Sequence, residues 1–284
     1  MEVEEVIPSL LIEVCVDSVE SAVNAVKGGA DRLEVCGNLG IGGGTTPTPG
    51  LVKSIKRALK DVPLMIMVRP RVGDFRYTSQ EIEVMLEDIA YFKELGVRGF
   101  VVGVLTEQGS VDIDIMKRPD SSIRRAFDMT KDPVQALEDI IEIGGISRLL
   151  TSGHGKSVPE SLGTLELLFK TAKRLQGDAV WGLTIMPGGG VNRNSITTIV
   201  QQLLPRGLRE IHLSGGRWNS SAMQFKREGM GFGASVEREW AVWATSKKEV
   251  YRVREAADFA WDEYWDGISE SESEEADPNP PSNE

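Results

Sequence analysis

The stretch LIEVCVDSVESAVNAVKGGADRLEVC, residues 11–36, decides the fold class of this 284-residue chain. It begins and ends with short apolar runs, which predict strands over residues 10–16 and 32–36. Between them, residues 18–27 have the amphipathic pattern of a helix. A strand, a helix and a second strand in this order predict a βαβ unit, whose two strands lie parallel in one sheet.

The same alternation continues along the chain. Six further strands are predicted, over residues 64–69, 99–105, 122–127, 148–152, 182–186 and 210–213. Further helices are predicted over residues 50–60, 79–95, 133–143, 159–175, 194–204 and 247–261. Eight strands in βα alternation predict a closed (β/α)8 barrel of the TIM type, which commonly uses about 250 residues as one domain. No GxGxxG follows the first strand, which argues against a doubly wound dinucleotide-binding sheet.

The last residues differ in composition from the rest of the chain. Residues 262–284 contain nine acidic residues and no Lys or Arg, so residues 1–261 carry only about −2 of the formal net charge of −11. We therefore predict a barrel domain over residues 1–261 and a disordered acidic tail over residues 262–284, which is too polar to order itself. A nearly neutral folded part lacks the basic surface that nucleic-acid binding requires.

The sequence also predicts the compartment. No apolar run approaches the roughly 18 residues of a membrane helix, and the acidic start MEVEEVIPSLL does not resemble a secretory signal. Two cysteines, Cys15 and Cys36, are too few for a disulfide framework. We expect a cytoplasmic protein without a membrane partner.

The first two predicted strands look like copies of each other, LIEVCVDS and RLEVCGNL. Strand alternation places Glu and Cys on one face and the aliphatic residues on the other in both copies. Because the outer face of a barrel packs against helices, Glu13, Cys15, Glu34 and Cys36 are expected inside. Both cysteines would then lie near the carboxyl-end mouth, where barrel active sites are found.

The two cysteines allow two interpretations. At matching positions on neighbouring parallel strands, their Cα atoms would lie roughly 5 Å apart, a spacing at which two thiolates suit Cu(I). Met65, Met67 and Met186 would add thioether ligands if they face inside. Alternatively, both thiols only pack, as buried cysteines commonly do. A structural zinc site is not favoured, because four nitrogen or sulfur ligands cannot be assembled.

A set of polar residues is predicted near the carboxyl ends of the strands. Its members are Glu13, Glu34, Arg69, Arg71, Asp74, Arg125, Asp128, Thr151, Ser152, His212 and Ser214. One interpretation is a structural network of Glu and Arg that fills the barrel, because buried charges need partners. The other is an enzyme that acts on a small phosphorylated or carboxylated metabolite.

In the enzyme interpretation, three arginines (Arg69, Arg71 and Arg125) bind the anion. Asp128, Ser152 and Ser214 complete the substrate site, and Glu34, Glu13 or His212 acts as general acid or base. The glycines of IMPGGGV (Gly188, Gly189 and Gly190) follow the seventh strand, where barrels often bind phosphate through backbone N–H groups. Tight turns use glycine in the same way, so this signal has two explanations. His154 is more simply a solvated side chain in a loop.

Together, these motifs resemble the CutC family. Besides the first stretch, the resemblance is carried by GGTTPTPG, MVRPRVGDFRY, EIEVMLEDI, GFVVGVLTEQG, RAFDM, RLLTSG, IMPGGGV and EIHLSG, in order over residues 9–260. It implies a (β/α)8 barrel, usually cytoplasmic and homo-oligomeric, with a role in copper homeostasis. It also implies Cys15 and Cys36 as the proposed copper ligands.

The sequence departs from the family pattern after the fourth strand. The family has a full helix there and then a strand that ends in His-Arg-Ala-Phe-Asp. Here the connection VDIDIMKRPDSSIRRAFDM is shorter, and Arg124 stands in place of the histidine. Pro119 and the strand-like alternation of VDIDI leave room for two helical turns at most, over residues 110–118. We expect a stunted fourth helix and a poorly covered fifth strand.

Overall fold

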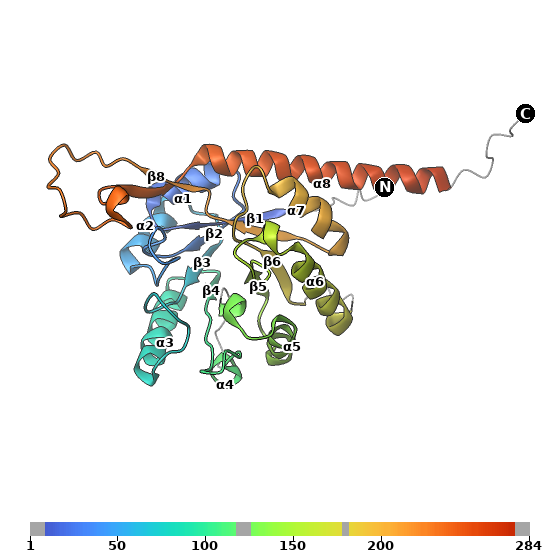
Figure 1. The fold of residues 1–284 in the computed structure, drawn as a ribbon, viewed down its shortest axis with the longest axis horizontal. Coiled ribbons are helices and arrows are strands. Elements are labelled where there is room, and N and C mark those ends of the chain that lie inside the picture. Colours follow the sequence, from blue (N-terminus) through green and yellow to red (C-terminus); the bar gives the residue numbers. More distant parts are fainter. Residues whose placement is uncertain (1–8, 118–125, 178–181, 276–284) are drawn as a thin grey trace, which may run out of the picture.

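The computed structural model describes residues 9–117, 126–177 and 182–275. Its central strands are parallel and alternate with helices, as Figure 1 shows. These strands are β1 (Leu11–Val16), β2 (Arg32–Val35), β3 (Leu64–Met67), β4 (Gly99–Val101), β5 (Arg148–Thr151), β6 (Thr184–Pro187) and β7 (Glu210–Leu213). The hydrogen-bonded order is β4-β3-β2-β1-β7, and β5 pairs with β6. A parallel bridge between Gly188 and His212 joins the end of β6 to β7.

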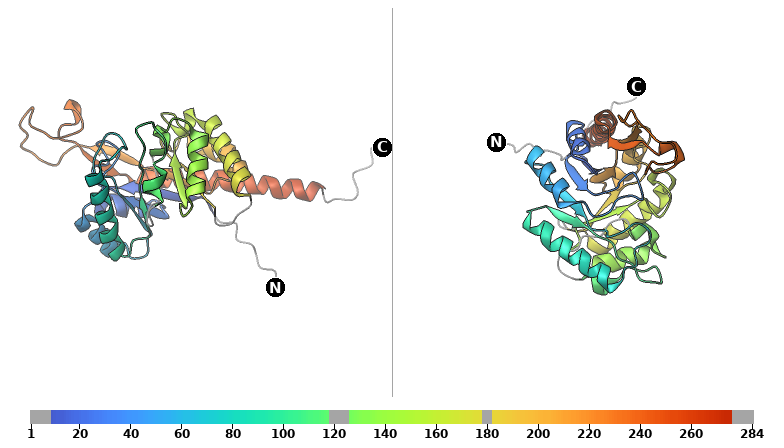
Figure 2. Two further views of the ribbon diagram at one scale, coloured as in Figure 1. Left: turned by 90° about the horizontal axis from the view of Figure 1, so that it is seen from below. Right: turned by 90° about the vertical axis from the view of Figure 1, so that its left-hand side faces the viewer.

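Helices surround these strands, so the fold is of the (β/α)8 TIM type (Figure 2). The outer helices are α1 (Val19–Lys27), α2 (Pro49–Ala58), α3 (Ser79–Glu94), α5 (Pro133–Ile143), α6 (Leu162–Gln176) and α7 (Ile196–Leu203). Short 3-10 turns lie at Val158–Glu160 and Leu204–Arg206. The predicted positions of all six helices are confirmed to within a few residues at either end.

Local sequence determines where the helices begin. Thr78 and Glu81 form a reciprocal capping box at the start of α3, with Thr78 Oγ1 accepting from Glu81 N at 3.2 Å and Glu81 Oε2 from Thr78 N at 2.8 Å. Asp132 caps α5 by accepting from the backbone N–H groups of Val134 and Gln135. A proline then occupies the first helical position, where its missing N–H costs nothing.

The outer and inner faces of the strands contribute to two separate apolar clusters. Outer residues such as Ile12, Val14 and Leu33 pack with the helices in the main core. Cys36 packs instead with Met65, Met67 and Val101 inside the barrel. Glutamate and cysteine therefore occupy the inner face, as the alternation of β1 and β2 predicts.

The fourth βα unit is short, as expected. Helix α4 (Ile113–Met116) is a single turn, capped by Asp112, whose Oδ1 accepts from Ile115 N at 3.1 Å. Most of the strand predicted over residues 122–127 lies outside the described residues. Its end is wrong, because Ala126–Met129 forms a 3-10 turn. Asp128 ties this turn to the end of β5 through its side chain, in place of backbone strand pairing.

The sequence analysis missed an antiparallel hairpin after β7. It consists of β8 (Gly216–Asn219) and β9 (Val242–Thr245), and a 3-10 turn at Val236–Arg238 lies in the connection between them. Trp218 and Trp243 are directly opposed, with ring centroids 5.4 Å apart. Residues 220–241 project away from the barrel, on the left of Figure 1 and of the left-hand view in Figure 2.

The last helix is longer than predicted. Helix α8 (Lys247–Glu275) packs against α1 and α7 and continues 14 residues past the predicted end at Trp261. The reason is that Tyr264 and Trp265 repeat the apolar spacing of Ala257 and Trp261 and remain partly buried. The domain boundary at residue 261 remains a prediction, and residues 276–284 lie outside the described part. Among the described helices, none is long and apolar enough to cross a membrane.

Candidate functional site

The pairing register of β1 and β2 corrects one expectation about the two cysteines. Cys15 lies opposite Glu34 on the neighbouring strand, and Glu13 lies opposite Arg32. Cys36 is therefore displaced from Cys15 by two residues along the strand direction. Strand geometry then gives a Cα separation of roughly 8 Å rather than 5 Å. The similar sequences of the two strands suggested matching positions, but neighbouring strands in a tilted barrel are staggered.

The same register brings Cys15 next to a carboxylate and an imidazole. One ligand atom each from Cys15, Glu34 and His212 lies within 4.8 Å of the other two. All three residues are buried, with exposed fractions of 4%, 2% and 2%. Of the described residues, these three form the cluster of His, Cys, Asp and Glu that could hold a metal ion. We call it the Cys15 cluster.

His212 is oriented by a carboxylate behind it. Its Nδ1 lies 2.9 Å from Glu13 Oε1, and its Nε2 lies 3.5 Å from Glu34 Oε2. If Nδ1 donates to Glu13, Nε2 is the nitrogen that belongs to the Cys15 cluster. A carboxylate that holds the remote nitrogen of a histidine is a common arrangement behind metal-bound imidazole.

Below the cluster, the inside of the barrel is filled by a chain of ion pairs. Arg32 contacts Glu13 through Nε at 2.5 Å and Glu210 through Nη2 at 2.5 Å. Arg148 Nε contacts both carboxylate oxygens of Glu210, at 2.8 Å and 3.0 Å. The ion pairs and hydrogen bonds thus run without a break from Arg148 to His212. This is the structural network of Glu and Arg, but it starts at the amino-terminal ends of the strands rather than at the mouth.

Sequence reasoning missed three members of this chain of ion pairs, namely Arg32, Arg148 and Glu210. The period of the strands contained the signal for two of them, because Arg32 and Glu210 each lie two residues before a residue expected inside. Arg32 precedes Glu34 and Glu210 precedes His212 on the same strand face. All three are the first residues of their strands, at the opposite end of the barrel from the expected site.

The environment of Glu210 makes the fold sensitive to acid. Burial alone would raise the pKa of Glu210, but the hydrogen bonds and charges of Arg32 and Arg148 outweigh it and hold the pKa below 4.5. A carboxyl group whose pKa is lower in the folded state stabilises the fold fully above its unfolded pKa. That stabilisation is lost as the pH falls through the folded pKa.

We therefore expect the melting temperature to fall as the pH is lowered below about 4.5, and to fall less steeply in Glu210→Gln. Differential scanning fluorimetry between pH 7 and pH 3 measures both profiles. Glu83→Gln is the control, because Glu83 is exposed on α3. Parallel profiles for Glu210→Gln and the unaltered protein would show that Glu210 does not cause the acid sensitivity.

The predicted anion-binding arginines are already engaged. Arg69 Nη1 donates to the carbonyl oxygens of Gly42 (2.7 Å) and Gly44 (3.0 Å), and Nη2 donates to Gly73 O (2.9 Å). Arg71 instead pairs with Glu81 at 2.6 Å and Asp74 at 3.0 Å on the rim. These pairs raise the pKa of Arg71 and lower the pKa of both carboxyl groups. Arg125 lies outside the described residues.

Asp128 and Ser152 lie together and bond to each other. Asp128 Oδ2 accepts from Ser152 N at 2.8 Å and from Ser152 Oγ at 3.0 Å, and Oδ1 accepts from Thr151 Oγ1 and from His154 N. His154 Nε2 lies 3.1 Å from Thr130 Oγ1, so the ring is not simply solvated. These hydrogen bonds hold the loop after β5 in place. Substrate binding by Asp128 and Ser152 remains a prediction.

The glycines after β6 have clear packing roles. A Cβ on Gly188 would lie 2.5 Å from Leu150 Cδ1 and 2.9 Å from His212 Cβ, so glycine allows β6 and β7 to approach. Gly189 and Gly190 have φ values of +113° and +75°, which favour glycine. Ser214 directly follows β7 at the mouth. Anion binding by these residues remains a prediction.

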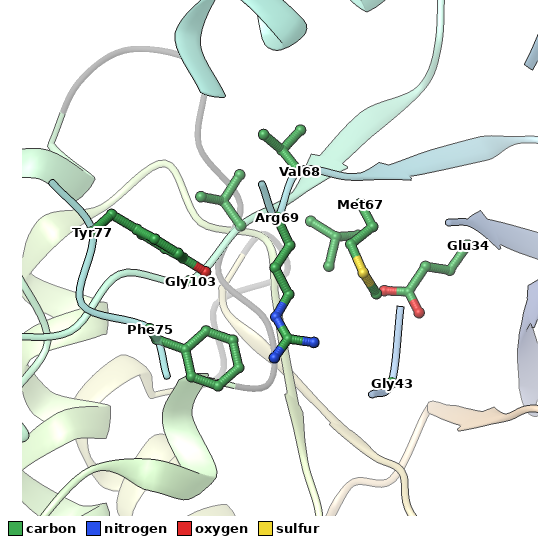
Figure 3. A pocket seen from close by; sticks show the side chains of 10 residues that line it. Glu34, Gly43, Met67, Val68, Arg69, Phe75, Tyr77 and Gly103 are labelled. Carbon is green, nitrogen blue, oxygen red and sulfur yellow. The ribbon is translucent and has the colours of Figure 1, made fainter. Parts of the chain in front are cut away.

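Beside the Cys15 cluster, a small pocket opens at the carboxyl ends of β2, β3 and β4. Figure 3 shows Glu34 and Arg69 entering it, with Met67 between them and Phe75 and Tyr77 on the far side of Arg69. Phe75 and Tyr77 were not among the predicted site residues. They belong to the loop after β3, whose path the sequence does not reveal.

The fold and the site together define a TIM-type barrel whose mouth holds a buried cluster of thiol, imidazole and carboxylate. A profile of the CutC family matches residues 10–217, and the chain belongs to this family.

Two relatives and one solved structure support this assignment. The human copper homeostasis protein cutC homolog is 41% identical over 233 residues, 80% of this chain and 81% of that protein. The family protein CutC of Chromobacterium violaceum is 38% identical over 257 residues, 88% of this chain and 99% of that protein. The solved CutC structure from Streptococcus agalactiae has a TM-score of 0.63 at 26% identity, covering 72% of this chain and 98% of that one. The predicted family and fold class are thereby confirmed.

Proposed function

We propose that this protein acts in copper homeostasis by binding Cu(I) at the barrel mouth, with the Cys15 thiolate as the central ligand. The observation that supports this most is the Cys15 cluster, in which a thiol, an imidazole and a carboxylate lie within 4.8 Å. Thiolate and imidazole are ligands that copper prefers, whereas an all-oxygen site would favour Mg²⁺ or Ca²⁺. The names of the curated relatives point to the same metal.

Cys36 is the second sulfur ligand in this proposal. It lies on the same inner face as Cys15 and packs with the thioethers Met65 and Met67. A Cβ on Gly44 would lie 2.8 Å from Met67 Sδ and 3.1 Å from Cys36 Cβ, so glycine keeps the loop after β2 close over this sulfur-rich cluster. Cu(I) accepts few ligands and tolerates irregular geometry, and His212 Nε2 can complete the set if Cys36 does not reach the ion.

The first experiment is a titration of the reduced, full-length protein with Cu(I) against a competing chelator. A Cys15→Ser/Cys36→Ser double variant is titrated beside it, with circular dichroism to establish that both proteins are folded. We expect one tightly bound Cu(I) per chain in the unaltered protein and none in the double variant. Equal binding by the two proteins would refute a thiolate site.

The expected compartment and assembly enter the proposal as well. Cys15 and Cys36 are both thiols rather than a disulfide, which fits a reducing cytoplasm.

A homo-oligomer would cover apolar side chains of the projecting segment over residues 220–241, where Phe225 and Phe232 are 73% and 95% exposed. Light scattering after size-exclusion chromatography measures the mass of the assembly. We expect a Phe232→Ser variant to shift that mass toward the monomer. If both the unaltered protein and the variant had the mass of a monomer, the proposed homo-oligomer would be contradicted.

A further inference from the structure

We propose that the pocket beside the Cys15 cluster binds a small carboxylic acid that carries a hydroxyl or ammonium group. This goes beyond copper binding, because the pocket has its own polar wall, formed by Arg69 and Tyr77 in the loop that follows β3. It lies at the carboxyl ends of the strands, where barrel ligands bind. It is small and partly open to solvent, which suits a short acid rather than a nucleotide.

Arg69 provides a fixed positive charge on one wall. Three hydrogen bonds to backbone carbonyl oxygens hold its guanidinium group, and its Cζ lies 4.9 Å from the centre of the Phe75 ring. Within the described ranges, no carboxylate lies at ion-pair distance from Arg69. A charge that is held in place by neutral carbonyl groups retains its attraction for an anionic ligand.

Two polar atoms on the same wall keep donor capacity for a ligand. Arg69 Nε and the Tyr77 hydroxyl are both buried, and neither makes a hydrogen bond of good geometry in the described part of the chain, although the Arg69 side chain lies close to the phenol. Burial raises the pKa of Tyr77, an effect that the nearby Arg69 and Arg71 only partly oppose, so the phenol keeps its proton. Native proteins rarely leave buried donors unsatisfied. Two neighbouring donors beside a positive charge match the two oxygens of a carboxylate.

The rest of the pocket determines what the acid carries. Met67, Val101 and Val102 form an apolar wall, which suits a short aliphatic body. Glu34 enters from β2 on the other side of Met67, as Figure 3 shows. Its carboxyl group can accept from a hydroxyl or ammonium group of the ligand. It would repel a phosphate dianion, which also needs more donors than this wall offers.

The experiment uses the full-length, reduced, copper-free protein, so that its result does not depend on metal binding. L-Lactate, 3-hydroxybutyrate, L-alanine and L-valine are titrated beside propionate and inorganic phosphate, with saturation-transfer NMR as the readout. We expect at least one of the hydroxy or amino acids to bind, and to bind about tenfold more tightly than propionate, which has no donor for Glu34.

Tyr77→Phe is the decisive variant, because it removes only a hydroxyl group that makes no hydrogen bond of good geometry within the described residues. We expect its melting temperature to be unchanged or raised, while affinity for the acid falls about tenfold. Tyr91→Phe is the matched control on α3, where the ring is 39% exposed, and it should retain full affinity. Failure of all four acids to bind, equal affinity in Tyr77→Phe, or a preference for phosphate would overturn the proposal.

Discussion

We expect Arg32→Met to lower the free energy of unfolding by about 3–5 kcal/mol, the cost of breaking a buried ion pair by removing one partner. The Arg32 side chain is 4% exposed and lies between Glu13 and Glu210, whose side chains are 0% and 10% exposed. Without it, Glu13 loses its buried cation, and Glu210 retains only Arg148. Methionine fills most of the volume, so the loss measures charge rather than a cavity. Urea unfolding followed by tryptophan fluorescence gives the value.

Two further variants separate charge from geometry. Arg32→Lys keeps the charge but cannot serve two carboxylates with one planar fork, so an intermediate loss is expected. Arg174→Met is the control, because its pair with Glu138 is on the surface, and we expect a change of 0–1 kcal/mol. If Arg32→Met were as stable as Arg174→Met, the buried chain of ion pairs would contribute no net stability.

The second large effect concerns copper. We expect Cys15→Ser to weaken Cu(I) binding by about a thousandfold or more, because a hydroxyl is a poor ligand for this soft ion. Cys36→Ser should weaken binding less, since the β1–β2 register sets Cys36 two residues beyond the position opposite Cys15. His212→Gln should fall between them, because it removes the imidazole of the Cys15 cluster. Competition titrations of the three single variants rank these losses.

Arg174→Met also serves as the control for copper, because it leaves the barrel interior unchanged. Equal losses in Cys15→Ser and Cys36→Ser would indicate two equivalent thiolates and an approach of the strands in the bound state. If His212→Gln bound Cu(I) with unchanged affinity, His212 would not be a copper ligand and would belong only to the buried chain of ion pairs. Circular dichroism of each variant distinguishes a lost ligand from a lost fold.

Much of the fold follows from local sequence. The alternation of β1 and β2, the capping residues and the apolar periodicity of the helices act over fewer than about twenty residues, so they are readable without a structure. The one-turn α4 was predictable for the same reason. The full length of α8 was not, because Tyr264 and Trp265 lie within the strongly acidic segment over residues 262–284, whose composition suggested disorder.

The sequence by itself determined the family, the barrel and the inner face on which Glu13, Cys15, Glu34 and Cys36 lie, because period-2 alternation fixes the side of a strand from which each residue projects. Only the tertiary structure decided which of these residues meet. The stagger between strands places Cys15 beside Glu34 instead of Cys36, and strand pairing over nearly 200 residues brings His212 to Glu13. Register between distant strands depends on how the whole barrel closes, and no local pattern specifies it.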